Sequence, residues 1–236
     1  MCKLLENIIN KRLRWFLEHS NILNPNQFGF RQYKSTIDYL INVQTEICDA
    51  FIQNEYTLAV FFDIEKAYDM IWKPKILNTV IKFKINGPIY SFINNFLTNR
   101  KIAVRVNGTL SKSTEIRNGV PQGSVISVTL FLLAINDITK KIIKPARTHI
   151  FADDITITCS GKNLNTTKGT IQSTIGNLEK WSNESGLKFS TQKTKYIIFS
   201  KKNHKHNETV FKQDRTRTRR PNKTPQPFAS ALLMSL

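Results

Sequence analysis

The sequence predicts an α+β fold in which strands and helices alternate and the strands return to one sheet. Three observations support this prediction: apolar residues recur at helical spacing through the first fifty residues, an apolar run "YTLAVFFDI" is typical of a central strand, and "THIFADDITITC" has strand character on both sides of two aspartates. With 236 residues, 40% of them hydrophobic, the chain is long enough to fill a sizeable core.

Two helices are expected before the first strand. The first is amphipathic, and the segment "NPNQFGFR" ends it with Pro25 and Gly29. Ser35 or Thr36 can cap the second helix, which has Asp38 in its first turn. The strand "YTLAVFFDI" follows directly, so the two helices and an ordered loop precede it.

The middle of the chain is predicted to be helical, then extended, then helical again. Pro74 suits the first turn of a helix that Gly87 and Pro88 end, and "IYSFINNFL" forms a further short helix. The segments "KIAVRVNG" and "STEIRNG" are typical of two strands joined by a turn. After the loop "GVPQGS", the apolar run Ser124–Ile135 predicts a buried helix, because it is too short to span a bilayer.

The last third of the chain combines strands with one long helix. We predict that "THIFADDITITC" is a hairpin with a very short turn, that Leu164–Trp181 is helical, and that "GLKFS" and "KYIIFS" are short strands. The apolar periodicity stops after Ser200. Residues 201–236 hold nine basic and two acidic residues, and we expect a basic disordered tail there, more consistent with a solvated charge run than with a specific nucleic-acid arm.

The charge of the chain points to a polyanionic partner. The formal net charge is +18, and residues 1–200 alone hold 26 basic and 15 acidic residues, so the body is basic without its tail. Nucleic acid is favoured over a membrane surface. The three cysteines have no paired or zinc-binding spacing, and neither a signal peptide nor a transmembrane segment is visible, so we expect an intracellular protein of the cytoplasm or nucleus.

Three aspartates are candidates for metal-dependent chemistry. Asp153 and Asp154 repel one another, although turns favour Asp for structural reasons alone. Asp63 ends the first strand, from which its carboxylate could face the same side as the turn. A divalent metal is the simplest compensation for such a cluster, and two Mg²⁺ ions would support in-line phosphoryl displacement. The carboxylates alone fit a nucleotidyl transferase and a nuclease equally well.

The segment "RNGVPQGSVIS" is a Gly-rich turn that leads into the buried helix. It lacks the Lys-Ser or Lys-Thr end of a phosphate-binding loop. Gly119 and Gly123 let the backbone approach a flat ligand, and Gln122 offers both a donor and an acceptor. The alternative is an ordinary loop between a strand and a helix.

The order and spacing of five segments resemble the reverse transcriptase domain of non-LTR (LINE-type) retrotransposons, most of all the jockey-like insect elements. The segments are "QFGFRQYKST", "FFDIEKAYD", "NGVPQGSVIS", "FADD" and "GLKFSTQKTKYIIFS", and the resemblance covers roughly residues 3–200. It implies the palm of a right-hand polymerase, a ferredoxin-like antiparallel sheet with packed helices, plus partial fingers, with the thumb missing. The fingers would lie mainly in residues 1–55 and 73–118, and the palm mainly in 56–72 and 119–200.

The resemblance also implies roles for the residues at the metal site. Asp63, Asp153 and Asp154 match the family's metal ligands for two Mg²⁺ ions, with Mn²⁺ as a possible substitute. Ile64 matches a position at the nucleotide site. Tyr68 matches the aromatic that lies under the sugar and excludes a 2′-hydroxyl, although a core aromatic is the structural alternative and the two roles are compatible.

Further residues are matched to the incoming nucleotide. Pro121, Gln122 and Gly123 match the loop that packs on the nucleotide and the template base. Arg31 matches a basic residue of the fingers that could reach the triphosphate. Lys193, in "TQKTK", matches the lysine proposed to protonate the departing pyrophosphate, and without the resemblance it would be a surface lysine.

The expected function is that of a fragment of an RNA-directed DNA polymerase, which adds dNMP to a primer 3′-hydroxyl. Its partners would be an RNA template with a DNA primer and dNTPs, and the oligomeric state is left open. The chain departs from the family pattern at Val128, usually Pro, at Lys34, usually His, and after Ser200, where no thumb is matched. An inactive nucleic-acid-binding relic is therefore an alternative. An RNA-dependent RNA polymerase is a further alternative, which Tyr68 and "PQG" oppose.

Overall fold

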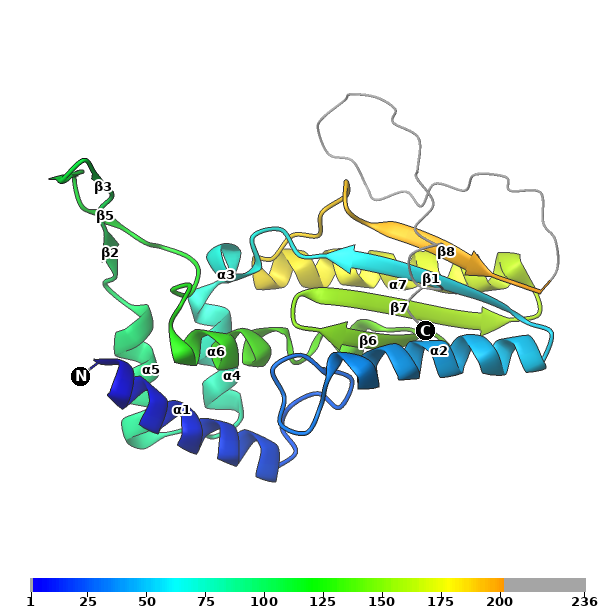
Figure 1. Ribbon diagram of the computed structural model, residues 1–236, viewed down its shortest axis with the longest axis horizontal. Helices are drawn as coiled ribbons and strands as arrows, with labels where there is room; N and C mark the ends of the chain where they lie inside the picture. Colours follow the sequence, from blue (N-terminus) through cyan, green and yellow to red (C-terminus); the bar gives the residue numbers. More distant parts are fainter. Residues whose placement is uncertain (1, 202–236) are drawn as a thin grey trace.

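A four-stranded antiparallel sheet organises the computed structural model, which describes residues 2–201 (Figure 1). The strand order is β6-β7-β1-β8. The strands are β1 (Tyr56–Asp63), β6 (Arg147–Phe151), β7 (Asp154–Gly161) and β8 (Lys195–Phe199). β1 is an interior strand and ends at Asp63, and β6 and β7 form a hairpin with a two-residue turn. These findings confirm the predicted α+β class, the predicted central strand and the predicted hairpin.

Two long helices cover opposite faces of the sheet. Because side chains alternate along a strand, Ile155 and Ile157 of β7 face the main core on the side of α7 (Leu164–Ser185). Thr156 and Thr158 face α2 (Thr36–Ile52), whose Tyr39 and Glu46 side chains hydrogen-bond to them. Ser35 caps α2 in a capping box with Asp38, as the sequence suggested.

Three further helices gather around one buried helix, α6 (Val125–Ile135). They are α1 (Cys2–His19), α4 (Lys73–Lys82) and α5 (Gly87–Leu97); α1 and α4 contact α6, and α5 packs on α4. All but two residues of α6 are buried, which confirms the predicted buried helix. Its first turn is held by Glu6 of α1, which accepts hydrogen bonds from the Ser124 hydroxyl (2.6 Å) and the Val125 amide (3.2 Å).

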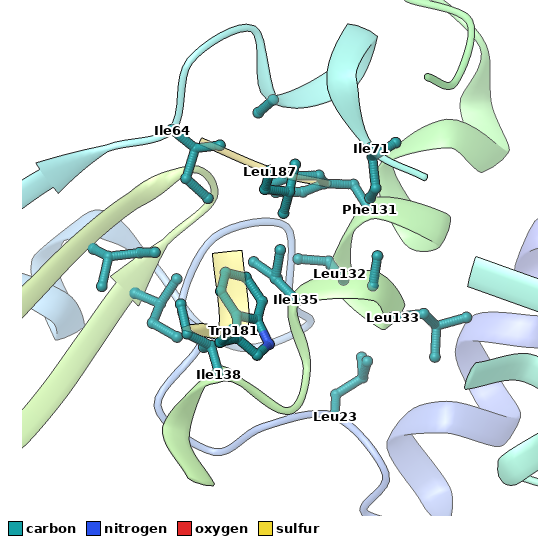
Figure 2. Packing of buried hydrophobic residues seen from close by; sticks show 14 of the residues in the cluster. Leu23, Ile64, Ile71, Phe131, Leu132, Leu133, Ile135, Ile138, Trp181 and Leu187 are labelled. Atoms are coloured by element: carbon teal, nitrogen blue, oxygen red, sulfur yellow. The ribbon is translucent and has the colours of Figure 1, made fainter. Parts of the chain in front are cut away.

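A continuous apolar core joins the sheet to the helices (Figure 2). Trp181 of α7 is fully buried within it, close to Ile138 of the short 3₁₀ helix η1 (Ile138–Lys141). The Trp181 indole donates to Asp137 Oδ1 (2.8 Å), and Lys75 of α4 pairs with Asp137 Oδ2 (2.7 Å). One carboxylate thus links α7, η1 and α4.

Three segments differ from the sequence-based expectations. "GLKFS" is not a strand: only a single bridge joins Phe189 to Ile64, because the chain turns away at Ser190. A short helix α3 (Ala67–Met70), not anticipated, follows β1. The two strands expected after α5 are four strands of two residues, nested as β2-β5 and β3-β4: β2 (Lys101–Ile102), β3 (Arg105–Val106), β4 (Thr109–Leu110) and β5 (Thr114–Glu115).

Two expectations concern the membrane and the end of the chain. Among residues 2–201 the structure contains no helix with the length and apolar character needed to cross a bilayer. The predicted basic tail, residues 201–236, lies outside the described residues except for Lys201.

Candidate active site

The register of the sheet brings two of the three candidate aspartates together. Asp63, the last residue of β1, is the direct partner of Asp154, the first residue of β7. Phe151 of β6 also pairs with Asp154, so Ala152 and Asp153 form the turn between the two strands. Ala152 adopts φ +58°, a left-handed conformation that favours so tight a connection. All three carboxylates therefore lie at one end of the sheet.

A loop that precedes α2 braces this turn from the outside. The Gln27 side chain accepts hydrogen bonds from the amides of Ala152 (3.1 Å) and Gly29 (2.9 Å), and donates one to the Ala152 carbonyl (3.3 Å). A Cβ atom at Gly29 would lie 2.3 Å from the Ala152 nitrogen, so only glycine fits here. The sequence analysis gave neither residue a role at the site, although both lie in the matched segment "QFGFRQYKST".

Lys193 reaches the carboxylate end of β1 by way of a second turn. The Asp63 carbonyl accepts a hydrogen bond from the Ser190 amide (2.8 Å), and the Ser190 hydroxyl accepts one from the Lys193 amide (3.3 Å). The Lys193 ammonium then lies 3.2 Å from both oxygens of the Asp63 carboxylate. Its side chain is 69% exposed, so this cation faces solvent as well as the aspartates.

The electrostatics of the cluster are unbalanced. Burial, and then the negative charges of Asp153 and Asp63, raise the pKa of Asp154, while Lys193 acts in the opposite direction. Across residues 2–201 no three Asp, Glu, His or Cys side chains are positioned closely enough to form a ready-made metal centre. The donor chemistry still fits a hard divalent cation, because the three groups offer only carboxylate oxygens and one lysine cannot neutralise three negative charges.

Tyr68 lies between the cluster and the core. Its ring packs against Phe131 of α6, with a centroid distance of 5.0 Å. Partial burial, and then the negative charge of Asp153, raise the pKa of Tyr68, and its ring packs against the buried core. Ile64 as a whole is 2% exposed and belongs to the core (Figure 2), so it supports the site from within rather than from the surface.

The loop that contains Gln122 is fastened to the segment directly after β1. The amides of Gly119 and Val120 donate to the carbonyls of Ile71 (2.8 Å) and Tyr68 (2.7 Å). The Gln122 amide group donates to Asp69 Oδ1 (2.9 Å).

Two glycines let the backbone of this loop pass close to other groups. Gly119 has φ +83°, and a Cβ atom there would lie 2.6 Å from the Asp69 carbonyl oxygen. Gly123, two residues after the half-buried Pro121, has φ +78° with open space beside it. Asp69 was not assigned a role from the sequence, although it lies within the motif "FFDIEKAYD"; its contact with Gln122 crosses 53 residues of chain.

Arg31 has a partner within the fold. Its guanidinium donates to both carboxylate oxygens of Glu18 in α1 (2.7 and 2.6 Å) and to the Asn24 carbonyl (2.7 Å). The side chain is 9% exposed. This residue therefore fixes the loop after α1, and no contact in the structure joins it to the aspartates.

Sequence comparison links the chain to one family. Residues 1–220 match the family model described as reverse transcriptase (RNA-dependent DNA polymerase). A probable RNA-directed DNA polymerase from transposon BS of Drosophila melanogaster is 32% identical over 82% of the chain. The RNA-directed DNA polymerase from the mobile element jockey of the same species is 26% identical over 84%. The chain spans 22% of the length of each of these relatives.

Solved structures share the fold. Telomerase from Candida tropicalis, in complex with a fragment of telomeric RNA, matches 95% of the chain with a TM-score of 0.62 and 13% identity, over 39% of its own length. A telomerase from the same yeast without RNA gives a TM-score of 0.60 over 83% of the chain and 36% of its own length. The match of the family model and the transposon relatives establish that the chain belongs to the reverse transcriptase (RNA-dependent DNA polymerase) family, among the non-LTR retrotransposon members that the order of its motifs predicts.

Proposed function

We propose that this chain is the fingers and palm part of an RNA-directed DNA polymerase, which extends a DNA primer on an RNA template. The observation that carries the proposal is the pairing of Asp63 with Asp154 at adjacent strand ends, with Asp153 in the turn between β6 and β7. In this proposal the sheet and its surroundings, residues 56–72 and 119–200, form the palm. Residues 1–55 and 73–118 form the fingers, and the protein acts in the cytoplasm or nucleus.

Asp63, Asp153 and Asp154 would hold two Mg²⁺ ions, or Mn²⁺ in their place. When bound, such ions activate a primer 3′-hydroxyl and neutralise charge on the reacting phosphates. The unbalanced negative charge around Asp154 supports this assignment, because among residues 2–201 Lys193 is the cation that acts on this group. The nucleophile and the leaving group are both parts of the substrates. Lys193 of this chain would supply the proton that the leaving group takes up.

In the proposed reaction the primer 3′-oxygen bonds to the α-phosphorus of a dNTP, the bond from that phosphorus to the β-phosphate oxygen breaks, and pyrophosphate leaves. The 3′-hydroxyl gives its proton to solvent. Lys193 would donate a proton to the pyrophosphate oxygen, and for this its ammonium must leave Asp63, a movement that its solvent exposure permits.

Tyr68, Gln122 and their neighbours would position the incoming nucleotide. The Tyr68 ring, supported from behind by Phe131, would pack under the sugar and leave no room for a 2′-hydroxyl. The loop of Pro121, Gln122 and Gly123 would lie against the base, and its attachment to Asp69 supports a fixed position. Ile64, which is buried, would support the nucleotide site from the core. Arg31, which the structure pairs with Glu18, would act by holding the fingers in shape.

The test is primer extension on an RNA template with Mg²⁺ and dNTPs. The variant Asp153→Asn/Asp154→Asn should lose activity at least about a hundredfold while it still binds the duplex. The control variant Asp49→Asn/Glu184→Gln also removes two negative charges, but at exposed positions away from the aspartate turn, and it should extend primers like wild type. If the wild type and the aspartate variant extend equally little while both bind, the chain is a nucleic-acid-binding relic. Extension with NTPs in preference to dNTPs would instead indicate an RNA polymerase.

A further inference from the structure

A two-stranded projection leaves the body of the protein between α5 and the Gln122 loop. Residues 100–117, here called the arm, contain β2 to β5, and Figure 1 shows them extending away from the helices and the sheet. Every residue from 101 to 115 is exposed. At the tip, Asn107 (φ +49°) and Gly108 (φ +85°) form the tight turn that two-residue hairpins favour.

The arm is rich in positive charge. It holds five basic residues and one acidic residue, a net charge of +4 in 18 residues, against +11 for the whole of residues 1–200. Lys101, Arg105, Lys112 and Arg117 are exposed, and none of them forms an ion pair with another described residue. The arm also exposes four aliphatic side chains, each more than half accessible to solvent: Ile102, Val104, Val106 and Leu110.

The base of the arm is fixed to the body, in contrast to its tip. The Ile116 amide donates to the Arg100 carbonyl (2.8 Å), and the Lys73 ammonium of α4 donates to the Ile116 carbonyl. The Arg100 guanidinium lies over the Phe96 ring, 4.9 Å from its centroid. Just beyond the arm, Gly119 is hydrogen-bonded to Ile71. A ligand bound to the arm would therefore be connected, through Gly119 and Ile71, to the segment that follows Asp63.

We propose that the arm binds the phosphate backbone of the template–primer duplex and holds it against the candidate active site; this inference rests on the function proposed above. Unpaired exposed Lys and Arg side chains are the groups that neutralise phosphates. A two-stranded ribbon is narrow enough to lie in a groove, and an RNA-containing duplex offers a wide, shallow minor groove against which aliphatic side chains can pack. A second copy of this chain fits less well, because it carries the same excess of positive charge.

The experiment compares two variants of the full chain that lose equal charge. Lys101→Ala/Arg105→Ala/Lys112→Ala changes the arm, and Lys144→Ala/Lys162→Ala/Lys180→Ala removes three exposed lysines that lie outside the arm, between η1 and β6, before α7 and in α7. Equilibrium binding to a 20-base-pair RNA–DNA hybrid is measured without dNTPs at several salt concentrations. We expect the arm variant to bind about tenfold to a hundredfold more weakly than the control. The slope of the logarithm of the binding constant against the logarithm of the salt concentration should fall in magnitude by about one for each phosphate contact removed.

The outcomes separate this inference from the proposed function. Equal binding and equal salt dependence of the two variants would overturn the role of the arm, even if both extend primers. Weaker binding by the arm variant alone supports it, even if no preparation shows synthesis. A change in oligomeric mass for the arm variant, with unchanged affinity for the hybrid, would overturn the inference and identify the arm as a contact between copies. Circular dichroism checks that both variants are folded.

Discussion

The carboxylate end of the sheet and the arm are built in opposite ways. Asp63, Asp153 and Asp154 are placed by the strand register, and backbone hydrogen bonds or buried side chains hold the turns around them on both sides. The arm has strands of two residues and is exposed from residue 101 to 115, and the hydrogen bonds that fix it to the rest of residues 2–201 lie at its base. The difference suggests a division of work, in which a rigid site determines where chemistry happens and an exposed charged projection determines how firmly a polyanion is held.

The two regions are connected through one short stretch of chain. α3 and the residues after it accept the hydrogen bonds of Gly119 and Val120, and Asp69 holds Gln122. Substitutions at the rigid end should therefore change both stability and rate. Substitutions in the arm should change affinity alone, and those in the connection should change nucleotide use.

The largest effect on stability is expected at the brace of the aspartate turn. In Gly29→Ala the new Cβ would lie 2.3 Å from the Ala152 nitrogen, and backbone must move to accept it. We expect a loss of about 2–3 kcal/mol in the free energy of unfolding and at least about a tenfold fall in primer extension. Urea denaturation and single-nucleotide incorporation measure the two effects.

Gly169→Ala is the matched control for this change. A Cβ atom there meets nothing within 4 Å, and the position lies inside α7, where alanine is the better helix former. Stability should rise by up to about 1 kcal/mol, with activity unchanged. If Gly29→Ala behaves like Gly169→Ala, the turn is not braced as described.

The next effect concerns Asp137, which links α4 to α7. Asp137→Ala removes the ion pair with Lys75 and leaves the buried Trp181 indole without its acceptor, at a cost of about 2 kcal/mol. Glu184→Ala removes the more exposed pair with Lys141 and should change stability little. Equal urea midpoints for the two variants would argue against the linking role.

The same carboxylate gives stability a dependence on pH. Burial acts to raise the pKa of Asp137, but the hydrogen bonds from Lys75 and Trp181 outweigh it and leave the pKa below its ordinary value of 3.8. A lowered pKa contributes stability above the unfolded value, and that stability is lost as the pH falls through the folded value. The difference between wild type and Asp137→Ala should therefore shrink below about pH 4.

Local patterns explain what the sequence predicted correctly. The end of β1 at Asp63, the β6-β7 hairpin, the capping of α2 by Ser35 and the burial of α6 follow from alternation, turn preference and hydrophobicity within a few residues. The contacts that complete the candidate site connect distant segments. Gln27 meets Ala152 across 125 residues, and Gln122 meets Asp69 across 53, distances at which periodicity carries no information.

Two expectations show how a tertiary partner changes the interpretation of a residue. Arg31 was matched to a triphosphate contact, yet its guanidinium donates to both carboxylate oxygens of Glu18 in α1 and to the Asn24 carbonyl. "GLKFS" has strand composition, but after Phe189 the chain turns to place Ser190 on the Asp63 carbonyl and Lys193 on the Asp63 carboxylate. In both segments a specific hydrogen bond, invisible in composition, decides the geometry.

A smaller effect is expected in the connection between the two regions. Asp69→Ala frees the Gln122 side chain, and the loss of one exposed hydrogen bond should raise KM for dNTP about three- to fivefold with a smaller change in kcat. Gln122→Ala should have a similar effect. Because both changes break the same bond, the double variant should be little worse than either single one. Steady-state incorporation measures KM for each variant. If the rise in KM of the double variant equals the product of the two single rises, the two residues act independently.

The smallest effect is expected at the tip of the arm. Gly108→Ala places a Cβ in open space, so only the left-handed backbone (φ +85°) opposes it. The arm contacts the body at its base alone, so the urea midpoint and the rate at saturating duplex should stay as in wild type, while affinity for the duplex falls about two- to threefold. Gly119→Ala has nearly the same backbone angle (φ +83°), but its Cβ would lie 2.6 Å from the Asp69 carbonyl oxygen. Gly119→Ala should therefore lower both the urea midpoint and the rate at saturating duplex. If Gly108→Ala also lowered these two quantities, the tip of the arm would be coupled to the rigid site, and duplex binding and catalysis would not be separate.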